Sequence, residues 1–125
     1  MNIYYHPLYT KGIDSKSTFP KERYDLIKTS LSVSKSSHLI TIKDPNPASI
    51  EDIYKAHSKD YVDAFLSSSL SEKQVREIGL KPWSNKIIDR TLLLTGGSLC
   101  ALSDLSKGAP AVSYTHLTLP TKNEV

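Results

Sequence analysis

The chain has 125 residues, of which 38% are hydrophobic and 23% are charged, and a formal net charge of +3. This length fits one small folded domain, and the composition excludes wholesale disorder. The basic residues are interspersed with acidic ones, and no apolar run approaches the roughly 20 residues that span a bilayer, so we expect neither a nucleic-acid nor a membrane partner. Because the N-terminus lacks the pattern of a secretory signal, we expect a cytoplasmic protein.

The first predicted elements are a strand, a loop, a helix and a second strand. Residues 3–5 are β-branched and aromatic, which favours a strand, and the Gly-, Ser- and Thr-containing stretch 8–19 predicts a loop. Pro20 suits the first turn of a helix, where its missing N–H costs nothing. The apolar face of that helix comprises Tyr24, Ile27 and Leu31. After a serine-rich break, residues 38–42 predict the second strand.

Four helices are predicted in the next part of the chain. Three short helices are each preceded by a serine that can cap them: Ser49, Ser58 and Ser71. Asp52 and Gln74 are placed to complete capping boxes at the first and third helices, and Gly79 ends the third. Ser84 can cap a long fourth helix. The apolar side of that helix comprises Ile88, Leu92, Leu99 and Leu102.

The pair Gly96-Gly97 interrupts the long helical pattern, at roughly 1 kcal/mol for each glycine relative to alanine. Two explanations stay open, namely close packing against another element or a break in the helix. Cys100 lies in the same apolar stretch and is the only cysteine, so it cannot form an internal disulfide. We interpret it as a buried, inert thiol.

The sequence does not itself define an active site. Its four histidines are far apart along the chain, whereas a zinc site needs three or four converging ligands: they are His6, His38, His57 and His116. Asp60 and Asp63 lie one turn apart, which we interpret as the solvated face of a helix. Gly-rich phosphate loops and Gly-x-Ser-x-Gly elbows are absent from the sequence. From the residues alone we expect an incomplete α/β domain, because two strands cannot form a sheet covered on both faces.

The order of several segments resembles a known family. Residues 5–7 (Tyr-His-Pro) and 19–24 (Phe-Pro-Lys-Glu-Arg-Tyr) are similar to the start of bacterial deacetylases near the class IV branch of the histone deacetylase family. Residues 47–66 resemble that family's proline-alanine-threonine stretch and the helix that follows it. Segments 78–84 and 90–99, which include Pro82-Trp83 and Gly96-Gly97, follow in the expected order.

This resemblance, which covers about residues 1–108, implies the N-terminal part of an arginase/deacetylase-like fold, a parallel sheet flanked by helices. It implies a zinc-dependent hydrolase that removes acetyl groups from lysine or a related acetylated amine. In such enzymes two Asp and one His hold zinc at the carboxyl ends of the strands. The zinc polarises the acetyl carbonyl and activates a water molecule, while two adjacent histidines handle protons.

In the family those catalytic and zinc-binding residues come after the segment that ends near Gly108. We therefore expect no catalytic or metal-binding residue in this chain, and no zinc bound by it. In the full-length enzyme we expect Phe19, Pro82 and Trp83 at the rim of the acyl-lysine entrance. Trp83 stands between the helix-ending Gly79 and the cap at Ser84, an exposed setting for a large side chain, and a core role for Trp83 stays open. Ser17-Thr18 stand where the family commonly has His-Arg, which leaves the substrate undetermined.

Residues 109–125 are expected to be a non-native tail. Residues 112–121 resemble one reading frame of the transposon-end adapter used for sequencing libraries, and they begin where the family's catalytic histidine segment should begin. The alternative is a natural β-rich terminus. We expect residues from about Ala109 onward to pack poorly, and we do not interpret His116 as catalytic.

Two other functions stay open. One is an acetylpolyamine amidohydrolase of the same fold, and the other is a non-catalytic helical interaction module that ends at Val125. The genomic DNA downstream of the codon for Ala111 distinguishes them. A continued frame that encodes Gly-Gly-x-His-His is predicted for a deacetylase, whereas a stop codon would favour the module.

Overall fold

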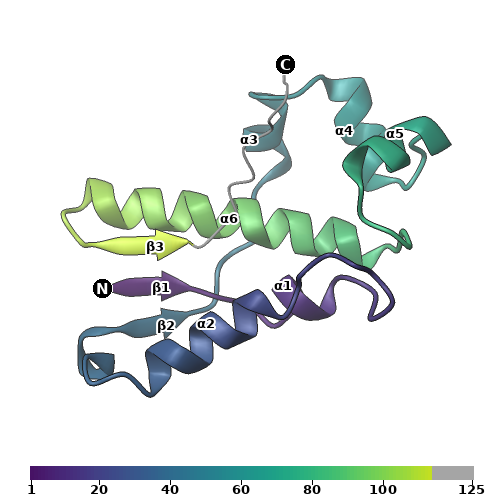
Figure 1. The fold of residues 1–125 in the computed structure, drawn as a ribbon. Coiled ribbons are helices and arrows are strands. Elements are labelled where there is room, and N and C mark those ends of the chain that lie inside the picture. Colours follow the sequence, from purple (N-terminus) through teal and green to yellow (C-terminus); the bar gives the residue numbers. More distant parts are fainter. Residues whose placement is uncertain (114–125) are drawn as a thin grey trace.

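The computed structural model describes residues 1–113 (Figure 1). His116 and the rest of the predicted tail after Ser113 lie outside the described residues. The elements, in chain order, are β1 (Asn2–Tyr4), α1 (Leu8–Lys11), α2 (Arg23–Ser32), the 3-10 helix η1 (Ser37–Leu39), β2 (Thr41–Lys43), α3 (Ile50–Tyr54), α4 (Lys59–Leu66), α5 (Glu72–Ile78), α6 (Lys86–Ser106) and β3 (Ala111–Ser113).

The three strands form one parallel sheet in the order β2-β1-β3. In this register Ile3 lies opposite Ile42 on one side and Val112 on the other. The central strand β1 is therefore hydrogen-bonded on both sides to strands that are distant from it in the sequence. The expectation of an α/β protein with a parallel sheet flanked by helices is confirmed at this level.

Helices pack on both faces of the sheet (Figure 1). Successive side chains of a strand point to opposite faces, and the hydroxyl of Tyr4 donates to Asp104 of α6 while that of Tyr5 donates to Asp25 of α2. The predicted apolar face of α2 contacts the sheet, since Tyr24, Ile27 and Leu31 border, together with Ile3 and Ile42, a cavity of about 20 Å³. The sheet thus forms the middle layer of three.

The glycine pair lies inside an unbroken helix, because α6 runs for 21 residues through Gly96 and Gly97. A Cβ added at Gly96 would lie 1.7 Å from the carbonyl oxygen of Asn46 and 2.8 Å from the amide nitrogen of Ala48. That same Ala48 N–H donates to the carbonyl of Leu92 at 2.9 Å. Close packing is therefore the correct explanation of the two glycines, and the helix break is wrong.

The predicted helix caps are largely confirmed. The side chains of Ser49, Ser58 and Ser71 each accept a hydrogen bond from the backbone N–H three residues later. Ser71 and Gln74 form a complete capping box, and the helix ends at Gly79 in the left-handed conformation, with a φ of 81°. The long helix begins later than predicted, with Asn85 and not Ser84 at its N-cap.

Three local predictions are wrong. The predicted loop at 8–19 contains α1, whose start is held by the N–H of Leu8, which donates to Nδ1 of His6 at 3.1 Å. The second strand is displaced to Thr41–Lys43, because residues 37–39 form the 3-10 helix. Poor packing from Ala109 onward does not hold for Ala111–Ser113, which pair with β1 as β3.

Among the helices of the described part, none is long and apolar enough to cross a membrane.

Candidate functional site

The strongest candidate site lies at the carboxyl edge of the sheet, between β1 and β3. The chain passes from β1 to β2 on one side and then returns past β1 to β3 on the other. In open parallel sheets, ligands bind outside the carboxyl ends of the strands at such a reversal of strand order. Topology alone therefore points to the residues that follow Tyr4 and to Ser113.

Tyr9, Gly97 and Ser113 meet at this edge, and we call them the edge cluster. A Cβ at Gly97 would lie 2.7 Å from the hydroxyl oxygen of Tyr9 and 2.9 Å from Oγ of Ser113. Tyr9 is only 1% exposed, and its hydroxyl donates to the carbonyl of Leu93 at 3.4 Å. Burial raises the pKa of Tyr9 to about 12. Glycine at position 97 leaves room for both hydroxyl groups.

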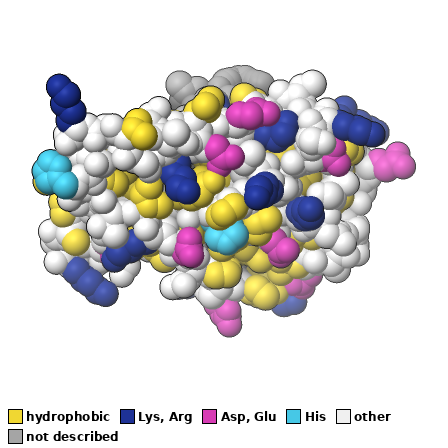
Figure 2. Space-filling view, turned by 90° about the horizontal axis from the view of Figure 1, so that it is seen from below, with side chains coloured by type: hydrophobic (Ala, Val, Ile, Leu, Met, Phe, Trp, Pro, Cys, Tyr) yellow, Lys and Arg dark blue, Asp and Glu magenta, His cyan; other side chains and the backbone are white. Residues whose placement is uncertain are grey.

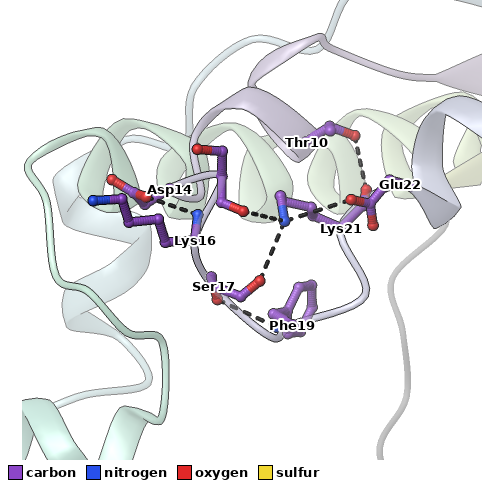
Figure 3. A network of polar contacts seen from close by, with 8 residues as sticks. Thr10, Asp14, Lys16, Ser17, Phe19, Lys21 and Glu22 are labelled. Atoms are coloured by element: carbon purple, nitrogen blue, oxygen red, sulfur yellow. Dashed lines mark hydrogen bonds and ion pairs between the residues drawn. The ribbon is translucent and has the colours of Figure 1, made fainter.

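Residues 12–22 connect α1 to α2 and form a segment that we call the 12–22 loop (Figure 3). Lys21 stabilises the inside of this loop, because its ammonium group donates to the carbonyls of Ser15 and Ser17 at 3.4 and 3.3 Å. The hydroxyl of Thr10 donates to the carbonyl of Lys21 at 2.8 Å and ties the loop to α1. Further bonds join the N–H of Lys16 to Asp14 and the N–H of Phe19 to Ser17. The loop is therefore ordered by its own polar contacts.

Phe19, a predicted rim residue, lies at the returning end of this loop and is half-buried. Its ring packs against the buried cluster of Tyr9, Tyr24 and Leu93. The guanidinium carbons of Arg23 and Arg90 each lie 5.4 Å from the centre of the Phe19 ring. Phe19 therefore packs on the buried core and contacts the cluster that contains Tyr9, a member of the edge cluster.

Pro82 and Trp83, the other predicted rim residues, have different surroundings. Pro82 is exposed, while Trp83 is half-buried and meets Phe65 of α4 edge-on, with ring centres 5.9 Å apart and an interplanar angle of 81°. Trp83 also borders a shallow hollow of about 380 Å³ over α5. The structure does not bring Trp83 into contact with Phe19.

The chain just after Trp83 does approach the 12–22 loop. Ser84, Asn85 and Lys86 line one side of an open groove of about 790 Å³, and residues 10–15 with Lys21 line the other. The predicted rim residues are not among the residues that line this groove, but residues that follow them closely in the sequence are. The role of the three rim residues stays a prediction.

Arg90 is the residue that sequence reasoning missed. It lies on the buried side of α6 with 5% of its surface exposed, and its Nε donates to the carbonyl of Tyr9 at 2.9 Å. Its Nη2 donates to the hydroxyl of Tyr24 at 3.2 Å. The signal that could have revealed it is a lone arginine near Ile87 and Ile88 on the apolar part of a helix.

Asp63, which follows His57 by six residues, serves a structural purpose. Asp63 accepts hydrogen bonds from Lys59 at 2.7 Å and from the hydroxyl of Tyr54 at 2.5 Å, and these bonds hold its pKa below the ordinary value. The contact with Tyr54 links α3 to α4. His57 and Tyr61 border an apolar hollow of about 300 Å³ between α3, α4, α5 and α6 that the sequence did not predict.

Within residues 1–113, no three His, Cys, Asp or Glu side chains lie close enough together to hold a metal ion. The described residues therefore do not fit a zinc site by themselves. Charges on the face in Figure 2 are also mixed, with Lys and Arg side chains lying among Asp and Glu and among hydrophobic ones.

An uncharacterized protein of Picosynechococcus sp. is 32% identical to this chain over 100 residues, which are 78% of this chain and 32% of the relative. The chain therefore spans about a third of the length of that relative. No family model matches the chain.

Proposed function

We propose that this chain is the N-terminal part of a zinc-dependent deacetylase of the histone deacetylase family. Its substrate would be an acetylated lysine side chain or a small acetylated amine. The observation that carries the proposal is that separate family-like segments converge on one edge of the sheet. Phe19 and Tyr24 from one segment pack on Tyr9, and Gly97 from another lies under the Tyr9 hydroxyl.

The form of the sheet supports an arginase/deacetylase-like fold. The order β2-β1-β3 with all strands parallel, and helices on both faces, is what the beginning of such a doubly covered sheet requires. The longer relative is compatible with it, because about two thirds of that protein lie outside the matched stretch. Those residues offer room for the remaining strands.

In the proposed enzyme, zinc would polarise the acetyl carbonyl and activate water. Its ligands and the adjacent histidine pair would come from sequence beyond the described residues. The residues of this chain would contribute the walls of the site. The 12–22 loop and residues 84–86 would border the entrance, and the edge cluster would lie at the carboxyl ends of β1 and β3.

The test begins with the genomic DNA downstream of the codon for Ala111, the last residue before the adapter-like stretch. We expect an open frame that encodes Gly-Gly-x-His-His. The completed chain should release acetate from an acetyl-lysine peptide or an acetylated polyamine, and a zinc chelator should abolish the activity. Preference for the polyamine would identify an acetylpolyamine amidohydrolase. A native stop codon, or a completed chain that is inactive on both substrates, would overturn the proposal.

A further inference from the structure

Arg90 contacts both ends of the 12–22 loop. At the outgoing end, a Cβ on Gly12 would lie 2.7 Å from Cβ and 3.1 Å from Cδ of Arg90, so the backbone of Gly12 rests on the aliphatic part of this side chain. At the returning end, the guanidinium group lies 5.4 Å from the centre of the Phe19 ring. One side chain of α6 thus supports the place where the loop leaves α1 and the place where it returns.

The polar contacts of Arg90 reach the two helices that flank the loop. Its Nε–H holds the carbonyl of Tyr9 on α1, and its Nη2–H holds the hydroxyl of Tyr24 on α2. The guanidinium carbon also lies 5.5 Å from the centre of the Tyr24 ring. Three elements separated by up to 81 residues in the sequence therefore meet on one guanidinium group.

The energetics make an arginine surprising at this position. Burying a guanidinium group is costly unless its donors are satisfied, and a leucine or methionine would pack on the buried side of α6 without that cost. The described hydrogen-bond acceptors of Arg90 are a carbonyl and a hydroxyl. These neutral acceptors offset less of the desolvation cost of the guanidinium group than a carboxylate would. A requirement other than core packing therefore explains its presence better.

We propose that Arg90 is a positioning residue that fixes the 12–22 loop, and with it Phe19, at the substrate entrance. This inference rests on the proposed deacetylase function. Arg90 does not touch the reacting atoms; it acts through Tyr9, Tyr24 and Phe19. Lys21 orders the interior of the loop, whereas Arg90 sets where the loop lies relative to α6 and the edge cluster.

The test uses the completed full-length chain with the variants Arg90→Met, Arg90→Lys and Tyr24→Phe. Tyr54→Phe is the matched control, because it removes a hydroxyl group from a contact between α3 and α4, remote from the loop. Two measurements are made: amide hydrogen exchange in residues 12–22, and KM and kcat for an acetyl-lysine peptide.

In Arg90→Met we expect exchange in the 12–22 loop to rise about tenfold to a hundredfold, the effect of losing hydrogen bonds to a charged group. Amides of β1 and α6 should stay protected. KM should rise about tenfold, since a loop displaced by an ångström costs at least that much. Arg90→Lys should recover part of both effects, Tyr24→Phe should show a smaller rise in loop exchange, and Tyr54→Phe should show neither.

Unchanged loop exchange in Arg90→Met, or exchange that rises equally in β1 and α6, would overturn the inference and make Arg90 a core residue. If Arg90→Met does not fold, Tyr24→Phe decides in the same way. If the wild-type completed chain has no deacetylase activity, the proposed function fails, while the exchange measurement still decides whether Arg90 fixes the loop.

Discussion

The hydroxyl group of Tyr4 on β1 donates a 2.5 Å hydrogen bond to Asp104 on α6, one hundred residues later in the chain. Asn2 donates to the same carboxylate oxygen at 3.1 Å. These bonds hold the pKa of Asp104 below its ordinary value of 3.8, the bond from Tyr4 being the larger cause. The C-terminal part of α6 is thus fastened to the first strand.

Tyr4→Phe should lower the melting temperature at neutral pH, and the difference from wild type should shrink in acid. A carboxylate whose pKa is depressed by folding contributes stability above its unfolded pKa and loses it as the pH falls through the folded value. The window is therefore below about pH 4. Thermal unfolding followed by circular dichroism from neutral pH into this range measures it. Asp104→Asn should lower stability without this pH dependence, and a constant effect of Tyr4→Phe would contradict the assignment.

Gly96→Ala should destabilise the protein although alanine favours helices. The substitution gains about 1 kcal/mol of helix propensity. Overpacking a tight contact costs about 1–3 kcal/mol or more, and here the Cβ would meet the Asn46 backbone at 1.7 Å, which no side-chain rotation relieves. We expect a clearly lower midpoint in urea. Ser98→Ala, at an exposed position of the same helix, is the control and should be nearly neutral.

A chain that ends at Pro110 should melt at a lower temperature than one that ends at Ser113. The shorter chain lacks β3 and leaves one edge of β1 without its hydrogen-bond partners. Differential scanning calorimetry of the two truncated chains measures the contribution. Equal transitions would show that β3 adds no stability and would restore the expectation that the chain packs poorly from Ala109 onward.

Trp83→Ala should weaken turnover by the completed enzyme and also lower its stability, because Trp83 packs edge-on against Phe65. Edge-on aromatic pairs are worth about 0.5–1.5 kcal/mol beyond the area that they bury. Trp83→Phe should keep most of the stability, so this variant separates the two roles. Normal turnover in a destabilised Trp83→Ala protein would make Trp83 a packing residue and remove it from the rim.

Residues 1–125 should bind no stoichiometric zinc and should not hydrolyse an acetyl-lysine peptide. The physical reason is the distribution of ligands, since zinc needs three or four converging side chains. The purified chain would be dialysed against zinc, and the bound metal and the hydrolysis measured. One zinc per chain with chelator-sensitive hydrolysis would show that the site is inside this chain.

Features set by neighbours in the sequence could be predicted, whereas features set by distant residues could not. The caps at Ser58 and Ser71 depend on an N–H three residues away, so a local pattern is sufficient. Helix α1 was missed because a four-residue helix has little stability of its own, and the bond from Arg90 to the Tyr9 carbonyl comes from 81 residues away.

The same distinction applies to the candidate site. The resemblance drew attention to Phe19 and Trp83, but no sequence pattern could show that Phe19 lies on two guanidinium groups while Trp83 turns toward Phe65. The pair Gly96-Gly97 signalled a close approach without naming the partner. Only the tertiary structure identifies that partner as the backbone of Asn46.

The strand order also has a consequence for synthesis on the ribosome. Asn2 is synthesised before both of its strand partners, Thr41 on one side and Ala111 on the other. At about 5–20 residues per second, β1 waits roughly 5–20 seconds for its second neighbour to be translated. During that interval the nascent chain exposes an unpaired strand edge beside Ile3. Cotranslational protection of β1, for example by a chaperone at the tunnel exit, should therefore raise the yield of folded protein.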